Sequence, residues 1–311
     1  PELRKFWEDS YKDSDVVIYH NFPKEGFVEH GLKKLKGKIK LMFLAWEETA
    51  YPQMWVDEIN ENLHGVLVPS AFVKEFLRAS GVKVPIEVVL EGLDPLVMDA
   101  EPSKFQVKTD KKNIFLHVST AKARKGVDVL INAYDKAFTS EDDVCLVIKS
   151  SFSPDNKVSE LIEKRKGDSL PEIKHIQKIL SDEDLKALML QANTHVYPSR
   201  AEGFGLPLAE AMYHKKLLIT TEYSGHTEFV NKENALLIEY ALEKVVNSEF
   251  GLVGSYWAEP SVKSLARQLK KAYSHYDSSE LKSIREEAHN TAKKLTWESV
   301  VDRINKFTDF L

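Results

Sequence analysis

Two glutamates frame the segment of this sequence whose residue types are best suited to chemistry. Glu202 and Glu210 stand on either side of a glycine-rich turn in "SRAEGFGLPLAEAM", residues 199–212. A carboxylate accepts two hydrogen bonds from a vicinal diol of the kind that ribose and hexoses carry. The pair therefore indicates sugar recognition. On spacing alone, a helix start whose acidic residues are favoured by the helix dipole stays open as the alternative.

The residues between the glutamates predict an anion site. We expect a strand over 195–199 and a helix from Pro207, because proline favours the first helical position. The first-turn N–H groups of such a helix have no partner within it and attract anions. Gly203 and Gly205 would let a ligand approach the backbone closely. Carboxylates that hold sugars around a helix-bound anion describe a site for a nucleotide sugar.

A cationic cluster precedes this segment in the chain. Lys122, Arg124 and Lys125 lie in the loop after an apolar run, and Gly126 opens the helix behind them. Because the carboxyl ends of parallel strands share one edge of a sheet, we expect these cations at the same cleft, where they would neutralise a diphosphate leaving group. For the triplet taken alone, a solvated charged loop is the alternative.

Nearly continuous apolar runs, alternating with amphipathic stretches, predict the elements that position these groups. Such runs are typical of parallel strands covered by helices on both faces. Strands are expected at 15–19, 40–46, 65–70, 86–92, 113–118, 144–148, 173–177, 195–199, 216–221 and 235–239, and helices at 127–138, 181–192, 261–276, 278–295 and 297–311. The polar stretch 99–112 predicts a linker. The sequence thus indicates an α/β protein of two doubly wound domains that face a cleft.

The composition excludes several classes of protein. The 311 residues include 43 Lys and Arg against 48 Asp and Glu, a net charge of −5 that disfavours a nucleic-acid partner. No apolar run approaches the ~20 residues that span a bilayer. Cys145, the single cysteine, lies in an apolar run, so we expect a buried thiol, no disulfide within the chain and a cytoplasmic location. The histidines show no zinc-binding spacing, and no G-x-G-x-x-G or Walker loop is present.

Several motifs together resemble the retaining glycosyltransferases of family 4. They are "EGFGLPLAEAM", "RKGVDVLINAY" upstream, "YPS" just before, "YSGHTEF" just after, "WAEPSVKSLARQL" and the terminal "LTWESVVDRI". The resemblance covers about 110–305 well and 40–98 more loosely. It implies the GT-B fold, in which two Rossmann-like domains face a cleft. The two glutamates match the family's pair of glutamates separated by seven residues.

The resemblance also implies roles for the donor-side residues. Glu210 would bind the donor ribose and Glu202 the transferred sugar, while the amides of Phe204, Gly205 and Leu206 would contact the diphosphate or the sugar. The implied reaction moves a sugar from a nucleotide diphosphate sugar, such as a UDP- or GDP-sugar, to a glycan, lipid-linked or protein acceptor. It retains the anomeric configuration and needs neither a metal ion nor a further cofactor.

The resemblance further implies that Lys125 binds the diphosphate and stabilises its departure. The sequence departs from the family at the tip of the preceding strand, where an arginine is usual and Ser119 and Thr120 stand instead. One phosphate contact is therefore missing, or Lys122 or Arg124 supplies it.

The domain organisation follows from the same comparison. We expect a partial N-terminal, acceptor-side domain over 1–98, with 297–311 packing back on it, and a donor-binding domain over 99–296. The family's first strand and glycine-rich loop have no counterpart here, so the first domain is expected to be incomplete. We expect either a fragment of a longer enzyme or a chain completed by a partner or a second copy in a homodimer.

The acceptor side gives weaker signals. His20, Glu47 and Glu48 follow predicted strands of the first domain and are candidates to contact an acceptor, with a polar strand end or a solvated loop as the alternatives. The lysine-rich run 31–40 would suit peripheral contact with an anionic membrane, although a solvated turn is favoured. A non-catalytic GT-B subunit that binds or stabilises a partner glycosyltransferase stays open as the alternative function.

Overall fold

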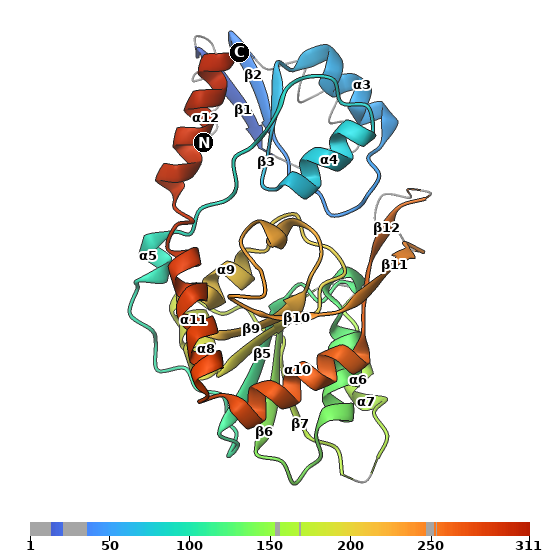
Figure 1. Cartoon of the computed structure of the whole chain (residues 1–311), viewed down its shortest axis with the longest axis vertical. Coiled ribbons are helices and arrows are strands. Elements are labelled where there is room, and N and C mark those ends of the chain that lie inside the picture. The colour runs from blue at the N-terminus through green and yellow to red at the C-terminus, as the bar shows by residue number, and fades with distance from the viewer. Residues whose placement is uncertain (1–13, 21–35, 153–155, 168, 247–251, 253) are drawn as a thin grey trace.

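The protein consists of two α/β units that lie one above the other along the long axis of the molecule (Figure 1). The structure is a computed structural model and describes residues 14–20, 36–152, 156–167, 169–246, 252 and 254–311. Each unit is built on a parallel sheet, as the continuous apolar runs predict. Part of the lysine-rich run, 31–35, lies outside the described residues.

The first unit is a parallel sheet with helices on both faces. Its strands lie in the order β1-β2-β3-β4, with β1 at Val16–His20, β2 at Ile39–Phe43, β3 at Gly65–Val68 and β4 at Ile86–Val88. Successive strand residues face opposite sides. Met42 therefore packs in the core formed with α3 (Gln53–Asn62) and α4 (Ala71–Ala79), and Leu41 packs on the other face.

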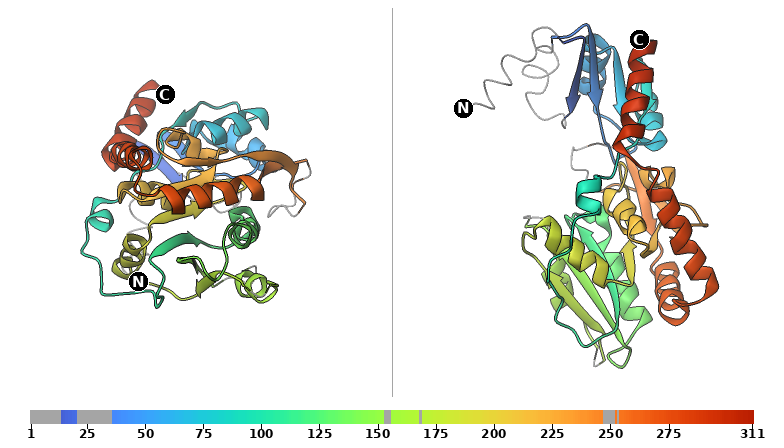
Figure 2. Two further views of the ribbon diagram at one scale, coloured as in Figure 1. Left: turned by 60° about the horizontal axis from the view of Figure 1, so that its bottom comes forward. Right: turned by 90° about the vertical axis from the view of Figure 1, so that its left-hand side faces the viewer.

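The helix on that other face comes from the end of the chain. Val300 and Phe307 of α12 (Trp297–Phe310) pack against Leu41, Leu67 and Val89. The side view in Figure 2 shows α12 running alongside the first sheet. The chain therefore crosses between the units twice, and the two crossings pair where Leu93 N–H donates to the carbonyl of Leu295 at 2.9 Å.

The second unit has a six-stranded parallel sheet in the order β10-β9-β8-β5-β6-β7. Its strands are β5 (Asn113–Ser119), β6 (Val144–Ser150), β7 (Glu172–Ile176), β8 (Thr194–Tyr197), β9 (Leu217–Thr221) and β10 (Leu236–Ile238). Both faces of the sheet are covered. This explains why residues 144–148 of β6 form an uninterrupted apolar run and why Cys145 within it is buried, as predicted.

Helices cover the two faces of this sheet in separate clusters. One face packs against α6 (Val127–Ala137), α7 (Val158–Glu163), α10 (Val262–His275) and the first half of α11 (Ser279–Ala292). The other packs against α8 (Asp182–Gln191), α9 (Leu206–Tyr213) and the second half of α11. Ser181 caps α8 by accepting a hydrogen bond from the amide of Asp184. A short helix, α5 (Pro95–Met98), packs on the second unit.

Two local expectations were wrong, and one element was not predicted. The strand expected at 86–92 ends at Val88, and Leu90 adopts φ +66°, which no strand residue does. The helix expected from Pro207 begins one residue earlier, at Leu206, because Gly205 is its N-cap. A hairpin of β11 (Tyr240–Lys244) and β12 (Tyr256–Pro260) was not predicted, since β11 is exposed on both faces and shows no apolar pattern.

Candidate active site

Two loops meet at the carboxyl edge of the second sheet. One follows β5 and contains a short 3-10 helix, Ala123–Lys125, and the other connects β8 to α9. β5 and β8 are neighbours at the point where the strand order reverses. Ligands of doubly wound sheets bind at such a switch point, so the topology places both predicted clusters where a ligand is expected.

A glycine makes the close approach of these loops feasible. Gly126 has φ +66°, and a Cβ at this position would lie 2.0 Å from the carbonyl oxygen of Pro198 in the other loop. Any side chain here would separate the loops or distort the backbone. Gly126 thus brings Lys125 against the segment that carries Glu202.

Glu202 is buried and surrounded by donors. The ammonium of Lys125 lies 2.7 Å from both of its oxygens, Arg124 Nη1 donates to Oε2 at 3.2 Å, and Ser199 Oγ donates to Oε1 at 2.7 Å. Burial alone would raise the pKa of Glu202, but the charges of Lys125 and Arg124 outweigh it and lower the pKa to about 2. The carboxylate is therefore ionised at neutral pH.

The structure brings the predicted sugar-binding and diphosphate-binding residues into direct contact. Burial lowers the pKa of Lys125, and the charge of Glu202 opposes that shift. Because the pair is buried and hydrogen-bonded, a diphosphate that binds Lys125 has to compete with Glu202 for the N–H donors of the Lys125 ammonium. Exchange of partners at Lys125 would leave the oxygens of Glu202 available to sugar hydroxyls.

Arg124 joins this cluster to the first unit. Its Nη2 lies 2.9 Å from Glu47 Oε1, so one predicted acceptor-side residue reaches the site. Glu48 follows it and is half-buried. His20 is exposed at the end of the edge strand β1 and contacts the ring of Phe43, with centroids 4.9 Å apart. Among the contacts of the described residues, none joins His20 to Glu202.

The start of α9 has the form expected of an anion site. Gly205 has φ +104° and directs the chain into the helix at Leu206. In the described part of the chain, the amides of Phe204, Gly205 and Leu206 donate to no protein acceptor. The Phe204 side chain packs on Phe229, so only its backbone is placed to meet a ligand. Glu210 is half-buried on this helix, and burial followed by the charge of Asp182 raises its pKa.

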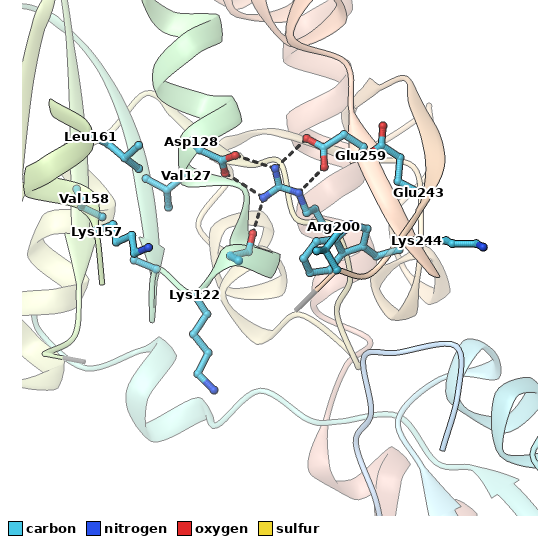
Figure 3. Close-up of a pocket in the computed structure, with 14 residues that line it drawn as sticks. Lys122, Val127, Asp128, Lys157, Val158, Leu161, Arg200, Glu243, Lys244 and Glu259 are labelled. Carbon is cyan, nitrogen blue, oxygen red and sulfur yellow. Dashed lines mark hydrogen bonds and ion pairs between the residues drawn. The ribbon is translucent and has the colours of Figure 1, made fainter. Parts of the chain in front are cut away.

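The strand tip that lacks the family's arginine has its own hydrogen bonds. Ser119 Oγ accepts from the amide of Ala121 at 2.9 Å and lies 2.8 Å from His117 Nε2. Thr120 is exposed. Lys122 precedes the 3-10 helix, and Figure 3 shows its ammonium directed away from Arg200. Of the two cations expected to replace the arginine, Arg124 is the one held in the Glu202 cluster.

Sequence reasoning missed Glu91 and Arg200. Glu91 lies in the loop after β4, and burial together with the charges of Glu47 and Glu202 raises its pKa to about 7. Within the described residues, no hydrogen bond or ion pair reaches its carboxyl. Its one sequence signal was a charged residue just beyond a buried run. Arg200 lies two residues before Glu202 and is buried, with partners at distant positions in the sequence.

The two units also touch directly across the site. Ser70 Oγ, at the start of α4, donates to the carbonyl of Gly203 at 2.8 Å. A Cβ at Gly203 would lie 3.2 Å from the Cβ of Ala45. The turn between the two glutamates therefore lies against the first unit, with little space to spare.

Two further observations concern metal ions and membranes. In the part of the chain that the structure describes, no group of three or more His, Cys, Asp and Glu side chains is placed to hold a metal ion. Every helix within the described ranges is too short or too polar to cross a bilayer.

Comparison with known proteins identifies this architecture. The solved sucrose-phosphate synthase of Thermosynechococcus elongatus superposes with a TM-score of 0.71 at 17% sequence identity, over 99% of this chain and 75% of that one. The fold is GT-B, with two Rossmann-like units. A profile of the family Glycosyl transferases group 1 matches residues 99–291, which is more than half of the chain. The chain belongs to the glycosyl transferases group 1 family.

Two curated relatives share part of the sequence. An MMP α-(1→4)-mannosyltransferase of Mycolicibacterium hassiacum is 29% identical over 168 residues, which are 53% of this chain and 40% of that protein. The GtfA subunit of a UDP-N-acetylglucosamine–peptide N-acetylglucosaminyltransferase of Limosilactobacillus reuteri is 28% identical over 134 residues, which are 42% of this chain and 25% of the relative. The matches thus span less than half of each relative.

Proposed function

We propose that this protein transfers a glycosyl group from a nucleotide diphosphate sugar to an acceptor hydroxyl or other nucleophile. The observation that carries the proposal is the buried cluster of Glu202, Lys125 and Arg124 beside the open amides of α9. A site that only packed two loops together would have no need for a buried carboxylate with two cations. Membership of the glycosyl transferases group 1 family supports the same activity.

The arrangement supports a division of roles within the donor site. Lys125 and the first amides of α9 would hold the diphosphate, Glu210 the ribose, and Glu202 the hydroxyls of the transferred sugar. As the bond from the anomeric carbon to the phosphate oxygen breaks, Lys125 stabilises the charge on the departing diphosphate. The acceptor attacks from the same face, and its proton passes to the leaving phosphate, so the configuration is retained. Neither a metal ion nor another cofactor takes part in this scheme.

The proposed acceptor is a glycan, a protein or a lipid-linked molecule. One relative is named for α-(1→4) mannosyl transfer and the other for N-acetylglucosaminyl transfer to a peptide, which supports a glycan or a protein as the proposed acceptor. A lipid-linked molecule is the third proposed acceptor. With such an acceptor, this protein would be cytoplasmic and would contact the membrane surface. Glu47 is the residue of the first unit best placed to meet any of them, because it already contacts Arg124.

The first test is donor binding in the presence of a chelator. We expect one family of nucleoside diphosphates and their sugars to raise the melting temperature of the chain, because only the folded state offers the site. Glu210→Ala should reduce that rise, whereas Glu222→Ala, which removes an exposed glutamate at the end of β9, should leave it unchanged. A Glu210→Ala chain that transferred sugar at full rate would contradict the site assignment.

The relative named as a subunit supports one alternative, a GT-B chain that serves a partner transferase. Transfer assays with the bound nucleotide sugar distinguish the two functions. An enzyme releases the nucleoside diphosphate when an acceptor is supplied, and a binding subunit does so only when its partner is added.

A further inference from the structure

A buried arginine lies behind the cations of the donor site. Beside residues 122–126, here called the cation loop, a pocket of about 600 Å³ opens between α6, α7 and the hairpin β11–β12. Figure 3 shows Arg200 at the wall of this pocket, between Asp128 and Glu259. Only 7% of Arg200 is exposed, so its guanidinium needs protein partners for its five N–H groups.

All of those donors are used, and they are directed to two sides of the guanidinium. Nη1 donates to Asp128 Oδ1 at 2.9 Å and to the carbonyl of Ala123 at 2.5 Å, and Nη2 donates to Asp128 Oδ2 at 2.8 Å. On the other side, Nη2 and Nε donate to the two oxygens of Glu259 at 2.8 and 2.5 Å. The side chain thus links the cation loop and the start of α6 to strand β12.

The backbone of Arg200 makes the same two connections. Its amide donates to the carbonyl of Arg124 at 2.7 Å, and its carbonyl accepts from the amide of Ala258 at 3.0 Å. Trp257 adds a ring 5.4 Å from the guanidinium carbon. Because Glu202 follows two residues later, these bonds set where Lys125 and Arg124 stand relative to Glu202.

The hairpin that holds Arg200 is itself fixed to the first unit. The amide of Tyr256 donates to Thr49 Oγ1 at 2.7 Å, and the amide of Thr49 donates to Ser255 Oγ at 3.2 Å. Leu252 packs on the core of the first unit. Figure 1 shows the hairpin rising from the second unit toward the first. Thr49 lies two residues after Glu47, the partner of Arg124.

From these contacts we propose that Arg200 is a positioning residue, which holds the cation loop against Glu202 and ties its placement to the hairpin and the first unit. The consequence for donor binding rests on the proposed function; the structural consequence does not. Lysine cannot replace Arg200, since a single ammonium cannot bridge two carboxylates and a carbonyl in fixed directions. A purely structural arginine would stabilise the fold without affecting the donor site.

Arg165 provides a matched control. Its side chain is 9% exposed, as is that of Arg200. Its Nε and Nη2 both donate to Asp135, and Nη2 also donates to the carbonyl of Pro171 at 2.8 Å. Asp135 lies on α6, two turns beyond the cation loop. Arg165→Lys should therefore cost a similar amount of stability without a contact to the donor site.

The experiment compares Arg200→Lys and Arg165→Lys in the full chain. Amide hydrogen exchange without any nucleotide should become at least about tenfold faster over 120–129 in Arg200→Lys alone. Calorimetric titration with the nucleoside diphosphate that stabilises the wild type should show about tenfold weaker binding for Arg200→Lys, and a change under about twofold for Arg165→Lys. Melting temperatures should fall comparably in both variants.

Equal exchange rates over 120–129 in the two variants would overturn the proposal. If the wild type binds no nucleoside diphosphate, the proposed function fails, while the exchange data still decide the role of Arg200. If Arg200→Lys does not fold, Glu259→Gln replaces it. Its control is Asp135→Asn, because the two carboxylates are similarly exposed at 28% and 23%. Faster exchange over 120–129 confined to Glu259→Gln supports the proposal, and its absence contradicts it.

Discussion

Two carboxyl groups near the same site have pKa values that are shifted in opposite directions. Glu202 lies against Lys125 and Arg124, and its pKa falls to about 2 despite burial. Glu91 is half-buried near Glu47 and Glu202, no cation of the described residues pairs with it, and its pKa rises to about 7. At neutral pH, the site therefore combines a fixed carboxylate with a carboxyl that is still partly protonated. The protonated carboxyl can donate a hydrogen bond to a sugar oxygen, whereas an ionised carboxylate can only accept one.

Glu91→Gln should show this difference as a pH-dependent gain in stability. The unfolded chain loses the Glu91 proton near pH 4.5, whereas the folded chain keeps it to about pH 7. Between these values the folded state binds more protons, so wild-type stability falls as pH rises through this window. The glutamine variant lacks that loss. We expect its free energy of unfolding to exceed the wild-type value by about 3 kcal/mol at pH 8 and to match it near pH 4.

Urea unfolding at several pH values measures this difference. Glu87→Gln, which removes a glutamate from the neighbouring strand β4, controls for the loss of a charge from the same segment. A constant difference between Glu91→Gln and the wild type from pH 4 to pH 8 would show that Glu91 is not held protonated.

Residue spacing was sufficient to predict some of these groups. Glu202, Lys125 and Arg124 were found because each follows a buried strand of the same sheet, where the ends of parallel strands must meet. Glu91 and Arg200 were missed because their surroundings are tertiary. Glu91 acquires its environment from residues of both units, and Arg200 binds partners near 128 and 259. The sequence around either residue does not indicate which distant residues will lie next to it in the fold.

At the scale of elements, the site depends on how closely two strand-to-helix loops approach. The parallel strands were predicted from their apolar runs because both faces of each sheet are covered. The hairpin β11–β12 was not predicted because its first strand is exposed throughout and therefore lacks a buried apolar face. Yet that hairpin carries Glu259 to Arg200 and Tyr256 to Thr49.

Gly126→Ala tests the loop approach. A Cβ there meets the carbonyl of Pro198 at 2.0 Å in a backbone with φ +66°, so the loops must separate. We expect a loss of about 3 kcal/mol or more in the free energy of unfolding, together with loss of donor binding. Gly254→Ala is the control, because its φ is +84° but nothing lies within 4 Å of a Cβ. Denaturant unfolding should show only about 1 kcal/mol of backbone strain for it. Equal losses in both would refute the steric argument.

At the scale of the whole molecule, the first unit is built from both ends of the described chain. Its sheet comes from residues before 90, and one of its faces is covered by α12. The contacts of Ser70 with Gly203, Glu47 with Arg124, and Thr49 with the hairpin join that unit to the donor side. A change in the first unit therefore reaches the cation loop by more than one path.

Phe307→Ala should weaken the first unit selectively. Phe307 is 7% exposed against Leu41, Leu67 and Val89, and its removal leaves a cavity. The expected cost is about 3–4 kcal/mol. Amide exchange should quicken in β2 and β3 and change little in β5 and β8. Phe310→Ala, on the same helix but 75% exposed, should change stability by less than about 0.5 kcal/mol. Equal acceleration in both sheets would show that the units unfold together.

The late position of α12 in the chain has a consequence for synthesis. Residues 39–89 leave the ribosome long before residues 300–307. One apolar face of the first sheet therefore stays exposed until α12 has been synthesised. The donor-side sheet, whose own helices are all made before α12, can form in the meantime. We expect the second unit of the nascent chain to fold before the first unit, which is completed only when α12 packs on its sheet.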